Sequence, residues 1–122
     1  MLDVNETKSE MSAGNEASSR LREILAFNRS SGRGGTYAVC SAHHAVVSAG
    51  IQQALTNGSL FHIESTSSQV NQFGGYTGAT PKQFADSIRK AARKSGLPEK
   101  HVLLGGDHLG PFPWLPHWFR PA

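Results

Sequence analysis

The feature that most constrains the fold is an alternation of short apolar runs with segments of helical periodicity. The apolar runs lie at 37–40, 60–63 and 102–104, and each follows a segment that contains glycine. Apolar residues at helical spacing occupy 45–55 and 81–95 between them. Strands that alternate with helices form right-handed βαβ units around a parallel sheet, whose strands are apolar throughout because both faces are buried. The sequence therefore predicts an α/β fold with a parallel sheet.

The helix at 81–95 carries the most complete end signals. Thr80 suits the N-cap position, Pro81 suits the first helical position, and Gln83 completes a capping box. Gly96 supplies a residue that ends a helix in the left-handed conformation. The same reasoning ends the preceding helix at Gly58, so local chemistry alone predicts where both helices stop.

The two ends of the chain depart from this pattern. Residues 1–19 hold four acidic residues and one basic residue without apolar periodicity, so we expect a disordered acidic tail. A short amphipathic helix is predicted over 19–29. Residues 112–122 combine aromatic residues with three prolines, which exclude a helix. The folded domain is therefore expected over 20–111.

Composition narrows the class of protein. Twelve basic and nine acidic residues give a net charge of +3, and no basic run is dense enough to predict a nucleic-acid partner. No apolar run approaches the roughly 18 residues of a membrane span, so no membrane partner is expected. The single cysteine, Cys40, excludes a disulfide framework and favours a reducing, cytoplasmic compartment. Such a cysteine more often packs as a small apolar side chain than acts as a nucleophile.

Polar groups gather where the predicted strands end. Glu64 follows the second strand, and Asp107 and His108 follow the third. Ligands of α/β proteins bind at the carboxyl ends of the strands. Imidazole and carboxylate groups both bind divalent metals, so His108 and Glu64 are candidate ligands for a metal such as zinc, and Asp107 is a candidate for proton transfer. Alternatively, Asp107 caps a turn and His108 makes only a hydrogen bond.

A long polar segment at 65–79 supplies candidate substrate-binding residues. Gly74 and Gly75 suit a loop whose backbone N–H groups hold a phosphate, and Asn71 and Gln72 carry amides that suit sugar hydroxyls. Ser41 adds a hydroxyl at the end of the first strand. The alternative for the glycines and amides is turn formation, which needs the same residue types.

Three segments have an unusual and extended composition. They read VCSAH at 39–43, IESTSSQVNQFGGYTG at 63–78 followed by Thr-Pro at 80–81, and LGGDHLGP at 104–111. Together they resemble the Z-subunit family of class II D-tagatose-1,6-bisphosphate aldolases (GatZ/KbaZ-like). Family members typically have Ala in place of Ser65 and Asn in place of Ser68, and both departures are mild.

This resemblance implies a TIM (β/α)8 barrel, of which the chain would hold about three βα units, truncated. It also implies a non-catalytic subunit of galactitol or N-acetylgalactosamine catabolism, which supports the activity and stability of a Y-type zinc aldolase. That aldolase cleaves the sugar phosphate tagatose 1,6-bisphosphate. The Asp107-His108 pair is similar to the Asp-His of class II aldolases, where Asp moves a proton and His binds zinc.

The chain departs from the family most clearly in its length. Family members are several times longer, and the family pattern is lost after Pro111; we expect a frameshift or a premature stop. The family also carries the label tagatose-6-phosphate kinase, although the chain has no Gly-Lys-Ser/Thr of a phosphate-binding loop. Some relatives epimerise sugars. The alternative is therefore a metal-dependent sugar-phosphate lyase or sugar epimerase completed by another chain.

Overall fold

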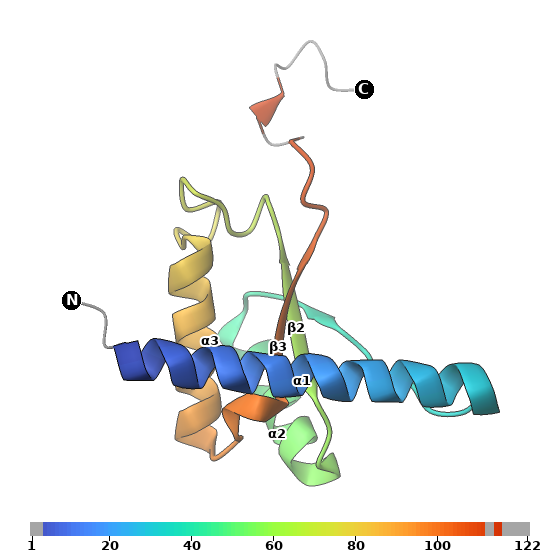
Figure 1. Cartoon of the computed structure of the whole chain (residues 1–122). Helices are drawn as coiled ribbons and strands as arrows, with labels where there is room; N and C mark the ends of the chain where they lie inside the picture. Colours follow the sequence, from blue (N-terminus) through green and yellow to red (C-terminus); the bar gives the residue numbers. More distant parts are fainter. Residues whose placement is uncertain (1–3, 112–113, 116–122) are drawn as a thin grey trace.

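The computed structural model describes residues 4–111 and 114–115. Helices and strands alternate along most of the chain, as the sequence predicts (Figure 1). In chain order, the elements are α1 (Val4–Ser31), β1 (Val39–Cys40), α2 (His44–Asn57), β2 (Phe61–Thr66), α3 (Pro81–Ser95), the short 3₁₀ helix η1 (Glu99–His101) and β3 (Val102–Asp107).

The three strands form one sheet in the order β1-β2-β3, and both pairs are parallel. The α/β class and the parallel sheet are therefore confirmed. β2 and β3 both extend further than the apolar runs indicate, to Thr66 and Asp107, whereas β1 is limited to two residues. β1 and β3 are the edges of the described sheet, so a closed barrel stays a prediction.

Both helices between the strands begin and end where their local chemistry dictates. In α3, Thr80 accepts a hydrogen bond from the N–H of Gln83, and the Gln83 side chain accepts one from the N–H of Thr80. Gly96 ends α3 at a φ of 82°, and Gly58 ends α2 at a φ of 62°. These left-handed conformations suit glycine, which has no Cβ to clash. The predicted capping box and both helix ends are confirmed.

The core lies between the sheet and the helices α2 and α3. Gly50 allows α2 to pack closely against the sheet, because a Cβ there would lie 2.5 Å from Cε2 of the buried Phe61 ring. Burying an apolar side chain of this size contributes about 1.5–3 kcal/mol. The core includes Phe61, Ile63 and Val102 from the sheet, Val47, Ile51 and Ala54 from α2, and Phe84, Ile88 and Ala92 from α3.

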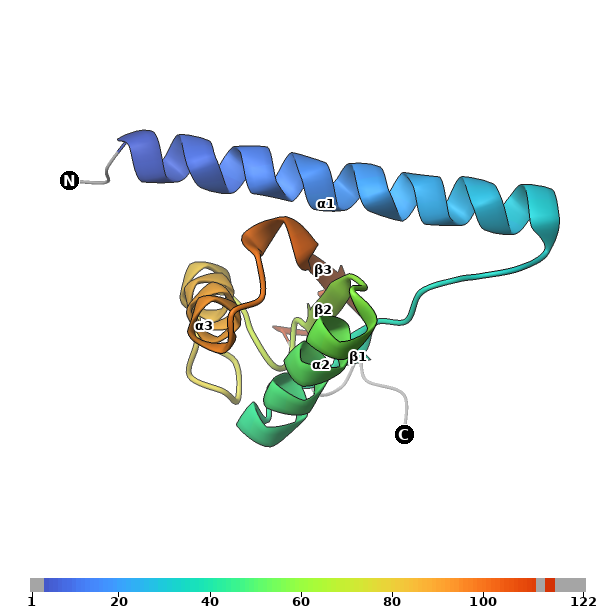
Figure 2. The same cartoon turned by 90° about the horizontal axis from the view of Figure 1, so that it is seen from below.

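The N-terminal segment contradicts the expectation of a disordered tail over residues 1–19 for its described part, residues 4–19. Helix α1 starts at Val4 and runs without interruption through the predicted 19–29 helix (Figure 1). The helix passes beside β3 and contacts both η1 and β3, with Ala17 fully buried (Figure 2). Tertiary contact therefore supplies the stabilisation that the local sequence lacks.

Two further expectations concern the ends of the chain and the membrane. The predicted tail at 112–122 lies outside the described residues except for 114–115. Among the helices that the structure describes, none combines the length and apolar character of a bilayer span.

Candidate functional site

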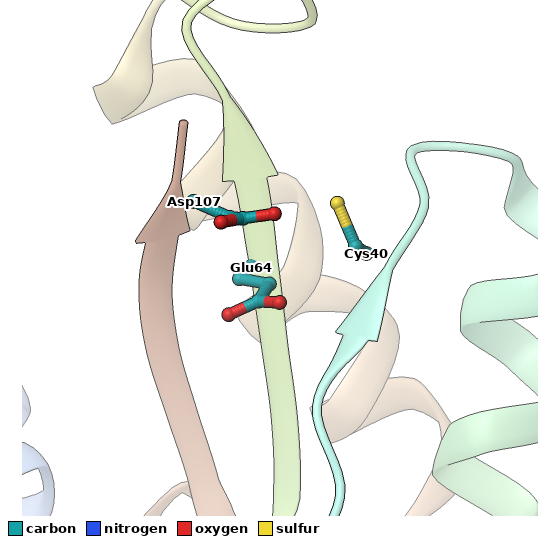
Figure 3. A group of neighbouring side chains, drawn as sticks. All are labelled: Cys40, Glu64 and Asp107. Carbon is teal, nitrogen blue, oxygen red and sulfur yellow. The ribbon is translucent and has the colours of Figure 1, made fainter. Parts of the chain in front are cut away.

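The register of the sheet places three ionisable side chains on one face near its carboxyl edge. Cys40 pairs with Glu64, and Glu64 pairs with Gly105. Asp107 lies two residues beyond Gly105 and therefore faces the same side, because side chains alternate along a strand. Figure 3 shows the three side chains projecting from this face. The opposite face carries Ile63 and packs against the helices.

These three side chains come from three adjacent strands and meet in space. One donor atom from each of Cys40, Glu64 and Asp107 lies within 4.8 Å of the other two. Cys40 is exposed, and both carboxylates are partly buried. Among the described residues, no other group of three His, Cys, Asp or Glu side chains brings its donor atoms this close.

The surroundings hold the Cys40 thiol in its protonated form. Its pKa is raised, first because partial burial penalises the thiolate and then because the negative charges of Asp107 and Glu64 repel it. A free thiolate is therefore disfavoured. Cys40 is exposed, however, so the expectation that it packs as a small apolar side chain is wrong. A cation placed among the three groups would instead favour the thiolate form of Cys40 over the thiol.

His108 lies next to this cluster but outside it. Its Nδ1 is 2.7 Å from Oδ2 of Asp107, and its side chain is 81% exposed. The residue has a φ of 49°, which is unusual for a residue other than glycine. Ser67 fixes this conformation in part, because its Oγ donates to the carbonyl oxygen of His108 at 2.9 Å. The structure thus brings Glu64, Asp107 and His108 to one edge, with His108 bound to Asp107.

The amide of Asn71 is used inside the loop that follows β2. Its Nδ2 donates to the carbonyl oxygen of Ser67 at 2.8 Å, and its Oδ1 accepts from the N–H groups of Phe73 and Gly75. Gly74 also donates its N–H to the carbonyl oxygen of Asn71. These contacts support the turn-forming alternative for Asn71 and for both glycines.

The remaining substrate-binding candidates occupy more open positions. Gln72 is exposed on the loop. Ser41 is half-buried, and its Oγ accepts from the N–H of His43 at 3.2 Å, just before α2 begins. Neither side chain belongs to the cluster of Cys40, Glu64 and Asp107.

The sequence did not indicate that Gln69 lies beside Cys40 or that Cys40 lies beside the carboxylates of Glu64 and Asp107. The Oε1 of Gln69 accepts from the N–H of Thr66 at 2.8 Å and lies 3.9 Å from Sγ of Cys40. Gln69 is buried even though its sequence context is polar. Cys40 itself joins the carboxylates only because β1 pairs with β2. No local sequence signal reports the contact of Cys40 with Gln69 or with the carboxylates, because both depend on the pairing of β1 with β2.

Comparison with known proteins agrees with the family resemblance of the three sequence segments. A family model described as "D-tagatose-1,6-bisphosphate aldolase subunit GatZ/KbaZ-like" matches residues 21–118, so the match continues past Pro111, where the family pattern was expected to be lost. The chain is 44% identical over 94 residues to the D-tagatose-1,6-bisphosphate aldolase subunit GatZ of Klebsiella pneumoniae. It is 43% identical over 94 residues to the D-tagatose 6-phosphate 4-epimerase of Agrobacterium fabrum. Each match covers 77% of this chain and 22% of the relative, so the chain spans about a fifth of their length.

A solved structure agrees with these sequence matches. It is the "probable tagatose 6 phosphate kinase from Sinorhizobium meliloti 1021", which is similar to this chain with a TM-score of 0.61 and 45% sequence identity. The similarity covers 66% of this chain and 21% of the other.

Proposed function

Because the chain belongs to the GatZ/KbaZ-like family of D-tagatose-1,6-bisphosphate aldolase subunits, we propose that it serves in carbohydrate catabolism as a Z-type subunit. In this role it supports the activity and stability of a catalytic Y-type aldolase and is inactive alone. The substrate of the complex would be tagatose 1,6-bisphosphate or a related sugar phosphate. A cytoplasmic location, where Cys40 stays reduced, is part of the same proposal.

The observation that carries this proposal is the polar carboxyl edge of the sheet. Glu64 and Asp107 lie at the ends of adjacent parallel strands, which is where α/β proteins bind their ligands. His108 is held against Asp107 at 2.7 Å. A sugar phosphate at this edge would meet carboxylates and an imidazole, which suit hydroxyl recognition and proton transfer.

The same proposal assigns the three strands to part of a (β/α)8 barrel. In a barrel, β3 would pair with a further strand along its outer edge. Helix α1 contacts β3, and a cavity of about 410 Å³ between them is lined by Met11 and Leu103 among others.

A divalent metal would fit the chemistry of the carboxyl edge. The donor atoms of Cys40, Glu64 and Asp107 lie within 4.8 Å of one another, and zinc accepts sulfur, nitrogen and oxygen ligands. When bound, such a metal polarises a carbonyl oxygen of the substrate. Glu64 and Asp107 would hold the metal beside Cys40, and His108 would orient the Asp107 carboxylate.

A second candidate function is epimerisation of a sugar phosphate. The observation in its favour is that the D-tagatose 6-phosphate 4-epimerase matches this chain as well as the aldolase subunits do, at 43% identity over the same length. An epimerase would use the carboxyl edge to move protons next to a sugar carbonyl, whereas a Z-type subunit leaves that chemistry to the Y-type aldolase. They differ in the need for a catalytic partner.

The two functions are separated by adding the full chain to a purified Y-type aldolase. The Z-type proposal predicts that the chain raises both the thermal stability and the aldolase activity of the Y-type subunit, and has no activity alone. No complex and no stabilisation of the Y-type subunit would overturn the proposal. Conversion of tagatose 6-phosphate by the chain alone would establish the epimerase.

A further inference from the structure

We infer that Cys40, Glu64 and Asp107 together bind one divalent cation of the zinc type, with the Cys40 sulfur as a ligand. The three donor atoms lie within 4.8 Å of one another, and each comes from a different strand. This assignment differs from the expectation that His108 and Glu64 are the ligands. It concerns metal binding by this chain itself, so it stands or falls independently of any Y-type partner.

The strand register gives this site a rigid base. Cys40, Glu64 and Gly105 form one row across the three strands, and Asp107 rises from the next position on the same face. Gly105 keeps the row open, because a Cβ there would lie 2.9 Å from Nε2 of His62 and 3.6 Å from Cβ of Glu64. The site therefore has two carboxylates and a thiol around a position that carries no side chain.

The spacing of the donor atoms suits zinc after a small adjustment. Zinc binds oxygen at about 2.0–2.2 Å and sulfur at about 2.3 Å, so the ligands of a tetrahedral site lie roughly 3.3–3.8 Å from one another. Donors that are now within 4.8 Å of one another would have to move closer by side-chain rotation on binding. A sulfur ligand favours zinc over magnesium or calcium, which prefer oxygen alone. On binding, the metal–sulfur bond replaces the S–H bond, and the thiol proton passes to solvent.

One neighbour fits the role of a positioning residue for this site. His108 holds Oδ2 of Asp107 from its Nδ1 at 2.7 Å. In the metal-free chain, the Oε1 of Gln69 accepts from the N–H of Thr66 and lies 3.9 Å from Sγ of Cys40, which is its donor only while the thiol is protonated. Groups that orient metal ligands in this way typically change metal affinity by about 10–100-fold when they are removed.

A cobalt titration of the full chain under reducing conditions tests the site. Co²⁺ replaces Zn²⁺ and gives a near-ultraviolet charge-transfer band only when a thiolate binds it. Because Cys40 is the single cysteine, any such band reports this residue. We expect one saturable band that Zn²⁺ abolishes and that Cys40→Ser lacks. A wild-type chain without the band would overturn the inference.

The carboxylates are tested by matched substitutions. Glu64→Gln and Asp107→Asn are expected to weaken Co²⁺ binding by about 10-fold or more, and His108→Gln by about 10–100-fold. Glu23→Gln and Asp86→Asn, which change exposed carboxylates elsewhere, are expected to leave the affinity unchanged. Equal affinity in the site variants and the controls would show that the thiol binds alone, and would overturn the three-ligand site.

A second measurement needs no variant and so does not depend on the folding of one. Cys40 is exposed, so a small alkylating reagent can reach it in the metal-free chain. We expect stoichiometric Zn²⁺ to protect Cys40 from alkylation and Mg²⁺ to leave the rate unchanged. Alkylation at the same rate with and without Zn²⁺ would contradict the site.

Discussion

Arg20 of α1 donates a hydrogen bond from Nη1 to Nε2 of His101, with 2.6 Å between the two nitrogens. A guanidinium has no acceptor, so Nε2 must accept and the imidazole must be neutral. Its Nδ1 then carries the proton and donates to the carbonyl oxygen of Ser59 at 3.2 Å. One neutral imidazole therefore joins α1, η1 and the segment before β2.

We expect the docking of α1 to weaken as the pH falls. The pKa of His101 lies below its ordinary value of 6.5, first because burial disfavours the charged ring and then because Arg20 is a nearby cation; Lys100 adds a smaller effect in the same direction. The Ser59 carbonyl acts in the opposite direction. A lowered pKa stabilises the folded state above pH 6.5, and this contribution is lost as the pH falls through the folded-state pKa.

Urea denaturation of the wild type and of His101→Gln, from about pH 8 to about pH 5, measures this effect. The wild type should lose more stability on acidification than His101→Gln, whose side chain does not titrate. Glu16 and Glu23 line a surface cavity together with Arg20 and Lys100, and all four residues are present in both proteins. Parallel stability profiles would contradict the prediction.

Gly50→Ala should destabilise the packing of α2 on the sheet. The added Cβ would meet the fully buried Phe61 ring at 2.5 Å, and forcing atoms into a packed core costs about 1–3 kcal/mol. Thermal unfolding followed by circular dichroism measures the loss. Gly14→Ala in α1 is the control, since a Cβ there meets nothing within 4 Å. It should stabilise the chain by about 0.5–1 kcal/mol, because Ala favours a helix over Gly.

Asn71→Ala should destabilise the loop after β2, whereas Gln72→Ala should not. The Asn71 amide makes three hydrogen bonds to the backbone, and each group left unpaired and buried costs about 1–3 kcal/mol. Gln72 is exposed, so its change should stay within about 0.5 kcal/mol. Proteolysis of the native chain at this loop and chemical denaturation both report the difference. Unchanged stability with weakened sugar-phosphate binding would instead favour a substrate contact for Asn71.

Thr80→Ala should lower the stability of α3 by about 0.5–2 kcal/mol, because it removes the N-cap acceptor of the capping box. Thr56→Ala, in the last turn of α2, removes a hydroxyl that only donates back to the carbonyl oxygen of Gln52. That control should change the free energy of unfolding by less than about 0.5 kcal/mol. Equal losses in the two variants would show that the capping box contributes nothing specific.

Local chemistry determined much of this protein from its sequence. The caps at Thr80, Gly58 and Gly96 act within a few residues of their helices, so their residue types alone predict them. The alternation of apolar runs with helices likewise predicted the parallel sheet. It also placed Glu64 and Asp107 at one edge, because parallel strands share a direction.

Tertiary structure decided what depends on residues far apart in the chain. The addition of Cys40 to the two carboxylates follows from the pairing of β1 with β2. Helix α1 extends to Val4, and its contacts with η1 and β3 include Arg20 bound to His101, 81 positions later in the sequence. The sequence determined the elements that carry their own caps and apolar runs, because propensity and capping are local. Only the fold decided which side chains meet, because that depends on register and packing.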